Sequence, residues 1–187
     1  MSSKYRKKTI GRSLRDQIEM WKKDFNISEY IDSLDFSKKA FAIELQLMKE
    51  KIKPNDYLLN LVKKLKDNNI KIAVATSSTK DRAIQLLKLV DFFDKIDILI
   101  TAEDINLHKP NPEMFLKAAE ELEVNPKNCI VIEDAVNGIQ AANAANMKSI
   151  AFVTSYHTKE EFQDIADLII NDFSEINYKN ITHLFPN

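Results

Sequence analysis

The chain has 187 residues, and its 27 Lys and Arg are balanced by 28 Asp and Glu, giving a formal net charge of −1. Because no basic excess is present, we expect no nucleic-acid partner. A hydrophobic content of 44% and a charged content of 29% are ordinary for a soluble globular protein. No apolar run in the sequence is long enough to cross a bilayer. We therefore expect no membrane partner and a cytoplasmic location.

Cysteine and glycine are both scarce in the sequence. Cys129 is the single cysteine, so it forms no disulfide within the chain and is expected to be a small apolar residue in a buried strand. The only glycines are Gly11 and Gly138, which excludes a glycine-rich phosphate loop. The first fifteen residues carry six basic side chains and no acid, which fits a solvated terminus or, alternatively, an organelle transit peptide.

Apolar residues at helical spacing dominate roughly the first 53 residues, and no strand-like run interrupts them. This pattern predicts a small helical subdomain over residues 1–53, followed by a main domain over residues 54–187. Pro54 marks the joint and is expected to begin the next helix. The residues that carry the helical spacing are Leu14, Ile18, Trp21, Phe25, Phe41, Leu45 and Met48.

The remainder of the sequence alternates between helix-like and strand-like stretches. Connections this short between alternating elements are typical of right-handed βαβ units. The predicted fold class is therefore α/β, with a Rossmann-like, mainly parallel sheet flanked by helices. Strands are expected at residues 70–75, 96–100, 129–132, 149–153 and 167–170, and helices at 58–65, 81–89, 112–122 and 136–145.

Polar side chains follow the first of these strands. Thr76, Ser77 and Ser78 stand between a buried strand and a helix. Their hydroxyls, together with the amides at the helix start, could hold an anion such as phosphate. Ser and Thr at this place more often serve only as helix caps.

Charged side chains follow the next two strands. Lys109 lies in the turn-rich loop His-Lys-Pro-Asn-Pro-Glu, where its charge could neutralise a phosphate. Glu133 and Asp134 come directly after the third strand, and carboxylates at such a strand end suit Mg²⁺. A hydroxyl, a lysine and a pair of carboxylates on successive strand ends together fit phosphoryl transfer.

These three features resemble the second, third and fourth motifs of the haloacid dehalogenase superfamily, above all its β-phosphoglucomutase-like and phosphoglycolate phosphatase-like branch. The resemblance rests on Thr76, on Lys109 within Lys-Pro-Asn-Pro-Glu, and on Glu133-Asp134 within Ile-Glu-Asp-Ala-Val-Asn-Gly. It implies a core domain with a helical cap. It also implies catalytic roles for Thr76 and Lys109. The implied phosphate-binding residues are Thr76, Ser77, Ser78 and Lys109, and the implied Mg²⁺ ligands are Glu133 and Asp134.

The resemblance extends into the helical part of the chain. Gly11-Arg12-Ser13 is similar to the family's short substrate loop, so Ser13 and Arg15 are candidate substrate-binding residues of the cap. Leu14 stands where the sugar-phosphate mutases of this branch would carry an arginine. This difference argues against mutase specificity.

The family's first motif is absent from these 187 residues. Members of the family carry Asp-x-Asp-Gly at the end of their first strand, and its first Asp is the nucleophile; no such sequence occurs here. Thr76 and Ser78 have no adjacent base that would make them substitutes. The sequence opens within what resembles the cap, so the first central strand is expected to be missing.

The missing strand would lie between the strands that end at Thr76 and Ile132. The stretch from Lys4 to Ile10 is too polar for a place that is apolar on both faces. Either the two flanking strands pair directly, or another segment or another chain donates a strand. Self-association is one form that such a donation could take.

Two functional hypotheses follow. The chain is a Mg²⁺-dependent phosphatase or phosphotransferase of small phosphorylated metabolites that is incomplete or inactive by itself, because the nucleophile motif is absent. Alternatively, it is a non-catalytic relative that binds phosphate, a metal ion or a protein.

Overall fold

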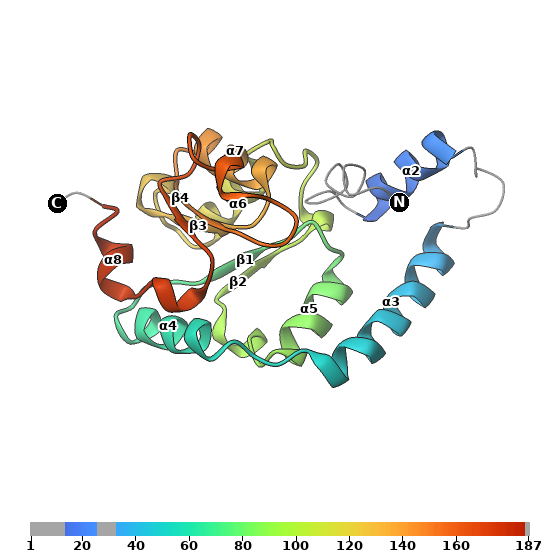
Figure 1. Cartoon of the computed structure of the whole chain (residues 1–187), viewed down its shortest axis with the longest axis horizontal. Helices are drawn as coiled ribbons and strands as arrows, with labels where there is room; N and C mark the ends of the chain where they lie inside the picture. Colours follow the sequence, from blue (N-terminus) through green and yellow to red (C-terminus); the bar gives the residue numbers. More distant parts are fainter. Residues whose placement is uncertain (1–13, 26–32, 186–187) are drawn as a thin grey trace.

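The computed structural model of the chain describes residues 14–25 and 33–185. Along these residues helices alternate with parallel strands, as the sequence predicts. In Figure 1, helices α2 and α3 lie on one side of the molecule, and the strands with their covering helices lie on the other. The Rossmann-like α/β fold class is therefore confirmed.

The N-terminal helices are α2 (Leu14–Phe25) and α3 (Ser33–Lys51). Helix α3 packs against α2 and against α5 (Lys80–Leu89). The contact with α5 includes a cation–π pair, in which the Arg82 guanidinium carbon lies 4.7 Å from the centre of the Phe41 ring. The helical character predicted for this part is confirmed within the described residues, whereas its status as a separate subdomain, residues 1–53, stays a prediction.

Helix α4 spans Asp56–Asp67 and leads from the helical part to the first strand. Its N-cap is Asn55, whose side-chain oxygen accepts a hydrogen bond of 3.0 Å from the Leu58 amide. The prediction that Pro54 begins this helix was wrong, because the helix begins after the Asn55 cap and Pro54 stands outside it. The buried face of α4 is formed by Leu61, Val62 and Leu65.

The strands form two parallel sheets. Strand β1 (Ala73–Ala75) pairs with β2 (Ile98–Ile100), and β4 (Lys148–Phe152) lies between β3 (Ile130–Glu133) and β5 (Leu168–Ile170). In the described part of the chain no ladder joins β1 to β3. The parallel strands are therefore divided between two sheets, and of the two alternatives left open by the sequence, direct pairing of the flanking strands is contradicted. The division falls at the place of the central strand that is expected to be missing from the sequence.

Strands β1, β2, β3 and β5 begin later in the sequence than predicted, and two of these starts have a visible cause. Strand β1 begins at Ala73 rather than at residue 70, because the Ile72 amide donates to the Asp97 carboxylate at 2.7 Å instead of to a neighbouring strand. Strand β3 begins at Ile130 because the preceding residues form the 3₁₀-helix η3 (Pro126–Asn128), which Cys129 terminates. Cys129 is thus half-buried beside the strand rather than inside it, and burial raises the pKa of its thiol.

Helices cover both faces of the strands. On one face, α6 (Glu113–Glu121) packs on β1 and β2, while α7 (Val136–Ala144) packs on β3 and β4 and also contacts α6. On the other face, α4 and the short helix α8 (Tyr178–Thr182) cover the three-stranded sheet, with Leu61 and Ile181 packed against Ile150 and Ile170. The three-stranded sheet is therefore held between two helical layers, as expected for parallel strands, and α6 covers one face of the two-stranded sheet.

Short 3₁₀-helices complete the connections. One of them, η2, follows β2 and begins with a capping box formed by Thr101 and Asp104. The 3₁₀-helices besides η3 are η1 (Phe93–Lys95), η2 (Ala102–Asp104), η4 (Lys159–Glu161) and η5 (Phe173–Glu175).

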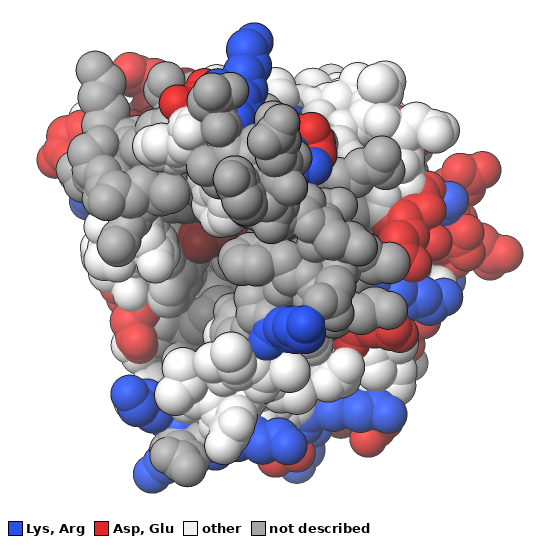
Figure 2. Space-filling view, turned by 90° about the vertical axis from the view of Figure 1, so that its right-hand side faces the viewer, with Lys and Arg blue, Asp and Glu red and all other residues white. Residues whose placement is uncertain are grey.

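Two surface properties bear on the expected partners. Among the described residues, no helix combines the length and the apolar character that a membrane span requires. On the face formed by α2 and α3, Figure 2 shows described basic and acidic side chains interspersed with each other.

Candidate active site

The loops that follow β1 and β2 are joined to each other. The Thr76 amide donates to the Ile100 carbonyl at 2.9 Å, and the Thr76 hydroxyl accepts from the Ser78 amide at 3.2 Å. The Ser78 carbonyl in turn accepts from the Ala102 amide at 3.0 Å. Thr76, Ser77 and Ser78 therefore lie in a fixed turn at the carboxyl edge of the β1–β2 sheet.

The start of α5 is capped from a distant segment. Its N-cap residue, Thr79, makes no side-chain capping bond, and the Lys80 amide donates to the Glu103 carboxylate at 3.0 Å. A carboxylate at a helix N-terminus is stabilised by the helix dipole. From the sequence, the amides of this helix start could hold an anion such as phosphate, or the hydroxyls before them could serve only as caps. Because Glu103 already binds one of these amides, an anion near Thr76 would bind the turn rather than the Lys80 amide.

Lys109 and Glu133 form a buried ion pair. The Lys109 Nζ donates to the Glu133 Oε2 at 2.8 Å, and the two side chains are only 5% and 11% exposed. The same ammonium group lies 5.0 Å from the centre of the Phe115 ring. A buried charge requires a partner, and here the carboxylate and the ring face supply it. The loop after β2 thus places Lys109 at the carboxyl end of β3.

The loop that carries Lys109 is fastened by Glu113, the first residue of α6. Its two carboxylate oxygens accept hydrogen bonds from the amides of Asn106 and Leu107, at 2.8 and 2.7 Å. The bond from Asn106 is the main cause that lowers the pKa of Glu113. The Glu113 amide donates to the Asn111 side chain at 2.9 Å. Both ends of the loop are therefore fixed by hydrogen bonds, in addition to the restriction by proline that the sequence predicts.

Glu133 lies against the start of α7. Its Oε1 accepts from the Ala135 amide at 3.2 Å. A Cβ atom added at Gly138 would lie 2.2 Å from the Glu133 Cδ, which is far inside van der Waals contact. Glycine at position 138 therefore allows the carboxylate to approach the helix closely enough to reach Lys109.

Asp134 stands next to this pair, and the residue as a whole is exposed. Partial desolvation of its carboxyl, reinforced by the negative charge of Glu133, raises the pKa of Asp134, and the positive charge of Lys109 opposes this effect. When ionised, the two carboxylates exceed the charge of Lys109 by one. This local excess of negative charge favours a cation.

The donor set is suited to Mg²⁺ but is only part of a site. Mg²⁺ commonly uses one or two carboxylates and completes its shell with water and phosphate oxygens. Among the described residues, no group of three or more His, Cys, Asp or Glu side chains is placed to hold a metal ion. Glu133 and Asp134 are the residues that would hold the ion. When bound, it would supply positive charge to a phosphate.

The predicted site residues thus lie at the carboxyl edges of their strands, and contacts link the three loops in series. Lys109 and Glu133 are in direct contact, whereas in the described part of the chain no hydrogen bond joins Thr76 to Lys109. Ser13 lies outside the described residues. Arg15 lies within α2, but its side chain is outside what the structure describes.

Sequence reasoning did not assign functions to Glu103, Phe115 and Gly138. Glu103 acts through the Lys80 amide, 23 positions away. Phe115 and Gly138 act on the nearby residues Lys109 and Glu133, through contacts that helix or strand spacing does not encode. Glu113 was noted only as the end of the Lys-Pro-Asn-Pro-Glu stretch. Its position at the first turn of a helix after two prolines is the signal that could have identified it.

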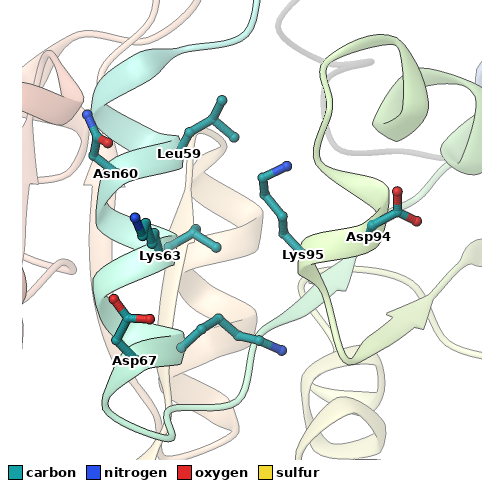
Figure 3. Close-up of a pocket in the computed structure, with 8 residues that line it drawn as sticks. Leu59, Asn60, Lys63, Asp67, Asp94 and Lys95 are labelled. Carbon is teal, nitrogen blue, oxygen red and sulfur yellow. The ribbon is translucent and has the colours of Figure 1, made fainter.

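A hollow of about 360 Å³ lies away from these residues, between α4 and η1. Figure 3 shows Lys63, Asp67, Asp94 and Lys95 around it. Asp67 precedes β1 and Lys95 precedes β2, so the hollow is at the amino ends of the strands. Ligands of open α/β sheets bind at the carboxyl ends. We therefore place the candidate active site at the Lys109–Glu133 edge and not in this hollow.

A Rossmann-like α/β fold with a lysine and paired carboxylates at its strand ends is the arrangement that the resemblance to haloacid dehalogenase-like hydrolases implies. The sequence matches the family described as "Haloacid dehalogenase-like hydrolase" over residues 1–152. The chain belongs to the haloacid dehalogenase-like hydrolase family.

Relatives and solved structures agree with this assignment. The chain is 32% identical over 126 residues to a validoxylamine A 7'-phosphate phosphatase of Streptomyces hygroscopicus, an alignment that covers 67% of this chain and 58% of the relative. It is 30% identical over 123 residues to a phosphorylated carbohydrates phosphatase of Thermotoga maritima, covering 65% and 57%. The chain therefore spans less than two thirds of the length of these relatives.

The fold is similar to that of a β-phosphoglucomutase from Clostridium difficile, with a TM-score of 0.82 and 27% identity. That comparison covers 98% of this chain and 81% of the solved chain. The β-phosphoglucomutase-like resemblance seen in the sequence is confirmed at the level of the fold.

Proposed function

We propose that this chain forms the phosphate- and Mg²⁺-binding part of a phosphatase that acts on small phosphorylated metabolites. The observation that carries the proposal is the buried Lys109–Glu133 pair, with Asp134 beside it, at the carboxyl edge of β3. The printed names of the two phosphatase relatives support a phosphorylated carbohydrate as the substrate class.

Each residue of the site has a defined part in this proposal. Thr76 would donate its hydroxyl hydrogen to a phosphoryl oxygen. Lys109 would balance the negative charge that the phosphoryl group carries during transfer. Glu133 and Asp134 would hold the metal ion. Ser77 and Ser78 would bind phosphate through the turn at the start of α5.

The attacking group is the part that these residues do not provide. The family resemblance implies an aspartate nucleophile in Asp-x-Asp-Gly, a sequence that the 187 residues do not contain. The chain alone is therefore expected to bind phosphate and to turn over phosphate esters slowly or not at all. Restoring such an aspartate at the carboxyl edge is expected to restore turnover.

Calorimetric titration with inorganic phosphate in the presence of Mg²⁺ tests the binding part of the proposal. The Lys109→Ala variant is expected to bind phosphate at least about tenfold more weakly, because it loses the buried positive charge. Lys127→Ala removes an exposed lysine in η3 and serves as the matched control. Absence of phosphate binding by the parent chain, or equal affinity in the Lys109→Ala variant, would refute the proposed function.

A second candidate function is binding without catalysis. It is favoured by the lack of an Asp-x-Asp-Gly nucleophile motif among the 187 residues. Assays with p-nitrophenyl phosphate and sugar phosphates over a range of Mg²⁺ concentrations separate the two functions. Phosphate binding without turnover, even after an aspartate-bearing strand is supplied, would favour the non-catalytic role.

A further inference from the structure

The hollow between α4 and η1 holds a charged group that the candidate active site does not use. Its volume of about 360 Å³ lies within the range of about 300–1,000 Å³ that is typical of small-molecule sites. Six of the residues that line it belong to α4, and two belong to η1. A ligand in the hollow would therefore contact both segments at once.

Hydrogen bonds within the chain fix the position of α4 at this hollow. The Lys66 Nζ of α4 donates to the Asp97 Oδ1, and the Asp97 Oδ2 accepts from the Ile72 amide at 2.7 Å. The Asp97 amide in turn donates to the Ile72 carbonyl at 2.7 Å. Asp97 thus ties α4 to the segments that lead into β1 and β2. Because the wall is held in place by the fold, a ligand need not order it.

The η1 wall is held from its own side. The Lys95 amide donates to the Phe92 carbonyl at 3.1 Å, and the Lys95 Nζ donates to the Asp91 carbonyl. The Lys88 ammonium group lies 5.2 Å from the centre of the Phe93 ring, a contact that links η1 to α5. Both walls of the hollow are therefore attached to the fold independently of each other.

The inner surface of the hollow is partly apolar. Val62 is buried and Leu59 is half-buried, and since they lie three positions apart on α4 they share one face of the helix. Figure 3 shows the Leu59 and Lys95 side chains pointing toward each other across the hollow. The methylene stem of Lys95 thus adds apolar surface from the opposite wall. A hydrocarbon group would be stabilised here because it displaces water from these surfaces.

Lys95 also brings a positive charge to the hollow without a carboxylate in contact. Its ammonium group donates to the Asp91 carbonyl, and in the described part of the chain it forms no ion pair. The charge of Lys66, by contrast, is matched by Asp97. Lys95 is half-buried, and a charge that is partly shielded from water interacts more strongly with an opposite charge. The hollow therefore favours an anionic group beside Lys95.

The other charges around the hollow favour a single negative charge. Lys63 brings a second ammonium group and Asp67 a carboxylate, both from α4. Figure 3 shows the Asp94 carboxylate pointing away from α4. Lys63 and Lys95 together therefore exceed Asp67 by one positive charge. A carboxylate balances this excess, whereas a phosphate dianion would exceed it.

We infer that the hollow between α4 and η1 binds a small monocarboxylate with an aromatic or branched hydrocarbon body. The carboxylate would pair with Lys95, and the hydrocarbon would lie on Leu59 and Val62. The hollow is at the amino ends of β1 and β2, whereas Lys109 and Glu133 lie at the carboxyl edge. The inference goes beyond the proposed function, because it holds whether or not the candidate active site is catalytic.

Titration of the full, isotope-labelled chain with sodium naphthoate, followed by NMR, tests the inference. We expect saturable shifts of the backbone amides of Leu59, Lys63 and Lys95, and none at Thr76 or Glu133. The neutral alcohol with the same ring system, naphthalene methanol, is expected to bind at least about fivefold more weakly, because it cannot pair with an ammonium group. Acetate carries the charge without the hydrocarbon body and is expected not to saturate over the same concentrations.

Protein variants identify the charge that is recognised. Lys95→Met removes the ammonium group and keeps an apolar stem, so the affinity for naphthoate should fall at least about fivefold, while the affinity for the alcohol should change less than about twofold. Lys64→Met makes the same exchange on α4 at a position that does not line the hollow, and it should bind naphthoate within about twofold of the parent. Leu59→Ser should weaken the acid and the alcohol alike. If Lys95→Met does not fold, the comparison of acid and alcohol in the parent chain decides the question.

Several results would overturn the inference. The absence of saturable shifts with naphthoate, or shifts centred on Thr76 and Glu133, would show that the ligand does not bind in the hollow. Equal affinity for the acid and the alcohol, or unchanged affinity in Lys95→Met, would show that the carboxylate is not recognised. Tighter binding of inorganic phosphate than of naphthoate beside Lys95 would assign the hollow to dianions. Because the two sites are followed through different amides, failure of this inference is distinguishable from failure of the proposed function.

Discussion

Replacement of Gly138 by alanine tests the architecture of the site, because it should lower the free energy of unfolding, whereas the same replacement in an ordinary helix raises it. Gly138 lies inside α7, where alanine ordinarily stabilises a helix by about 1 kcal/mol over glycine. Here the new Cβ would lie 2.2 Å from the Glu133 Cδ and 2.6 Å from its Oε1. The Glu133 side chain would have to leave its position.

The magnitude follows from what Glu133 holds in place. Moving its carboxylate breaks the 2.8 Å bond to Lys109, whose side chain is only 5% exposed, and the 3.2 Å bond from the Ala135 amide. Loss of one partner of a buried ion pair costs about 3–5 kcal/mol. After the helical gain of about 1 kcal/mol, we expect Gly138→Ala to lower the free energy of unfolding by about 2–4 kcal/mol.

Urea unfolding monitored by circular dichroism measures this change, and a double-mutant cycle supplies the control. In a Glu133→Ala background the clash is gone, so the added Gly138→Ala change should stabilise the chain by about 1 kcal/mol. The reasoning is refuted if Gly138→Ala is as stable as the parent, or if its effect has the same sign in both backgrounds.

Two further predictions concern stability away from the site. Glu123 follows α6 and has a positive φ of 55°, so Glu123→Gly should raise the free energy of unfolding by about 1 kcal/mol. Glu120→Gly, on the exposed face of α6, should lower the free energy of unfolding by about 1 kcal/mol. Urea midpoints that shift in the same direction in both variants would contradict this prediction. Hydrogen bonds from the Thr101 hydroxyl at 2.6 Å and the Thr101 amide at 2.8 Å lower the pKa of Asp104 below its usual value of 3.8. The ionised carboxylate therefore stabilises the fold above that value, and the contribution is lost as the pH falls through the lower folded pKa. Asp104→Asn should be less stable than the parent at pH 7 by an amount that shrinks in acid, and a pH-independent difference in unfolding free energy would exclude this account.

The alternation of helices and strands could be predicted from the sequence because it depends on local periodicity. The β-branched run before Glu133 and the helical spacing after it are properties of neighbouring residues. The predicted first residues of the strands were less accurate, because side-chain contacts determine where a ladder begins. Asp97 bonds the amide of Ile72 and ends the ladder there, a contact across 25 positions that local periodicity does not encode.

The site shows the same division between local and distant causes. Thr76, Lys109 and Glu133 follow predicted strands or the loops after them, so sequence order placed them at one edge. The contacts that hold these residues were not predictable, because the Glu103 carboxylate acts on an amide 23 positions away and the position of the Phe115 ring beside Lys109 depends on how the intervening loop folds. The split between β1 and β3 could be anticipated only from the absent first motif, and not from composition or periodicity.

The division into two sheets bears on how the chain unfolds. A two-stranded sheet is marginal by itself. Within the residues that the structure describes, β1–β2 shares no ladder with β3, β4 and β5, and helical packing connects the two sheets. Helix α6 contacts β1, β2 and α7, so its packing connects the two-stranded sheet to the helix that covers the three-stranded sheet. Proteins open in cooperative units whose free energies differ, and units with fewer internal bonds open first. Residues 73–100 should therefore exchange their amide hydrogens through a partial unfolding that leaves β3–β5 folded. Weakening the packing of α6 should replace a single unfolding transition by two.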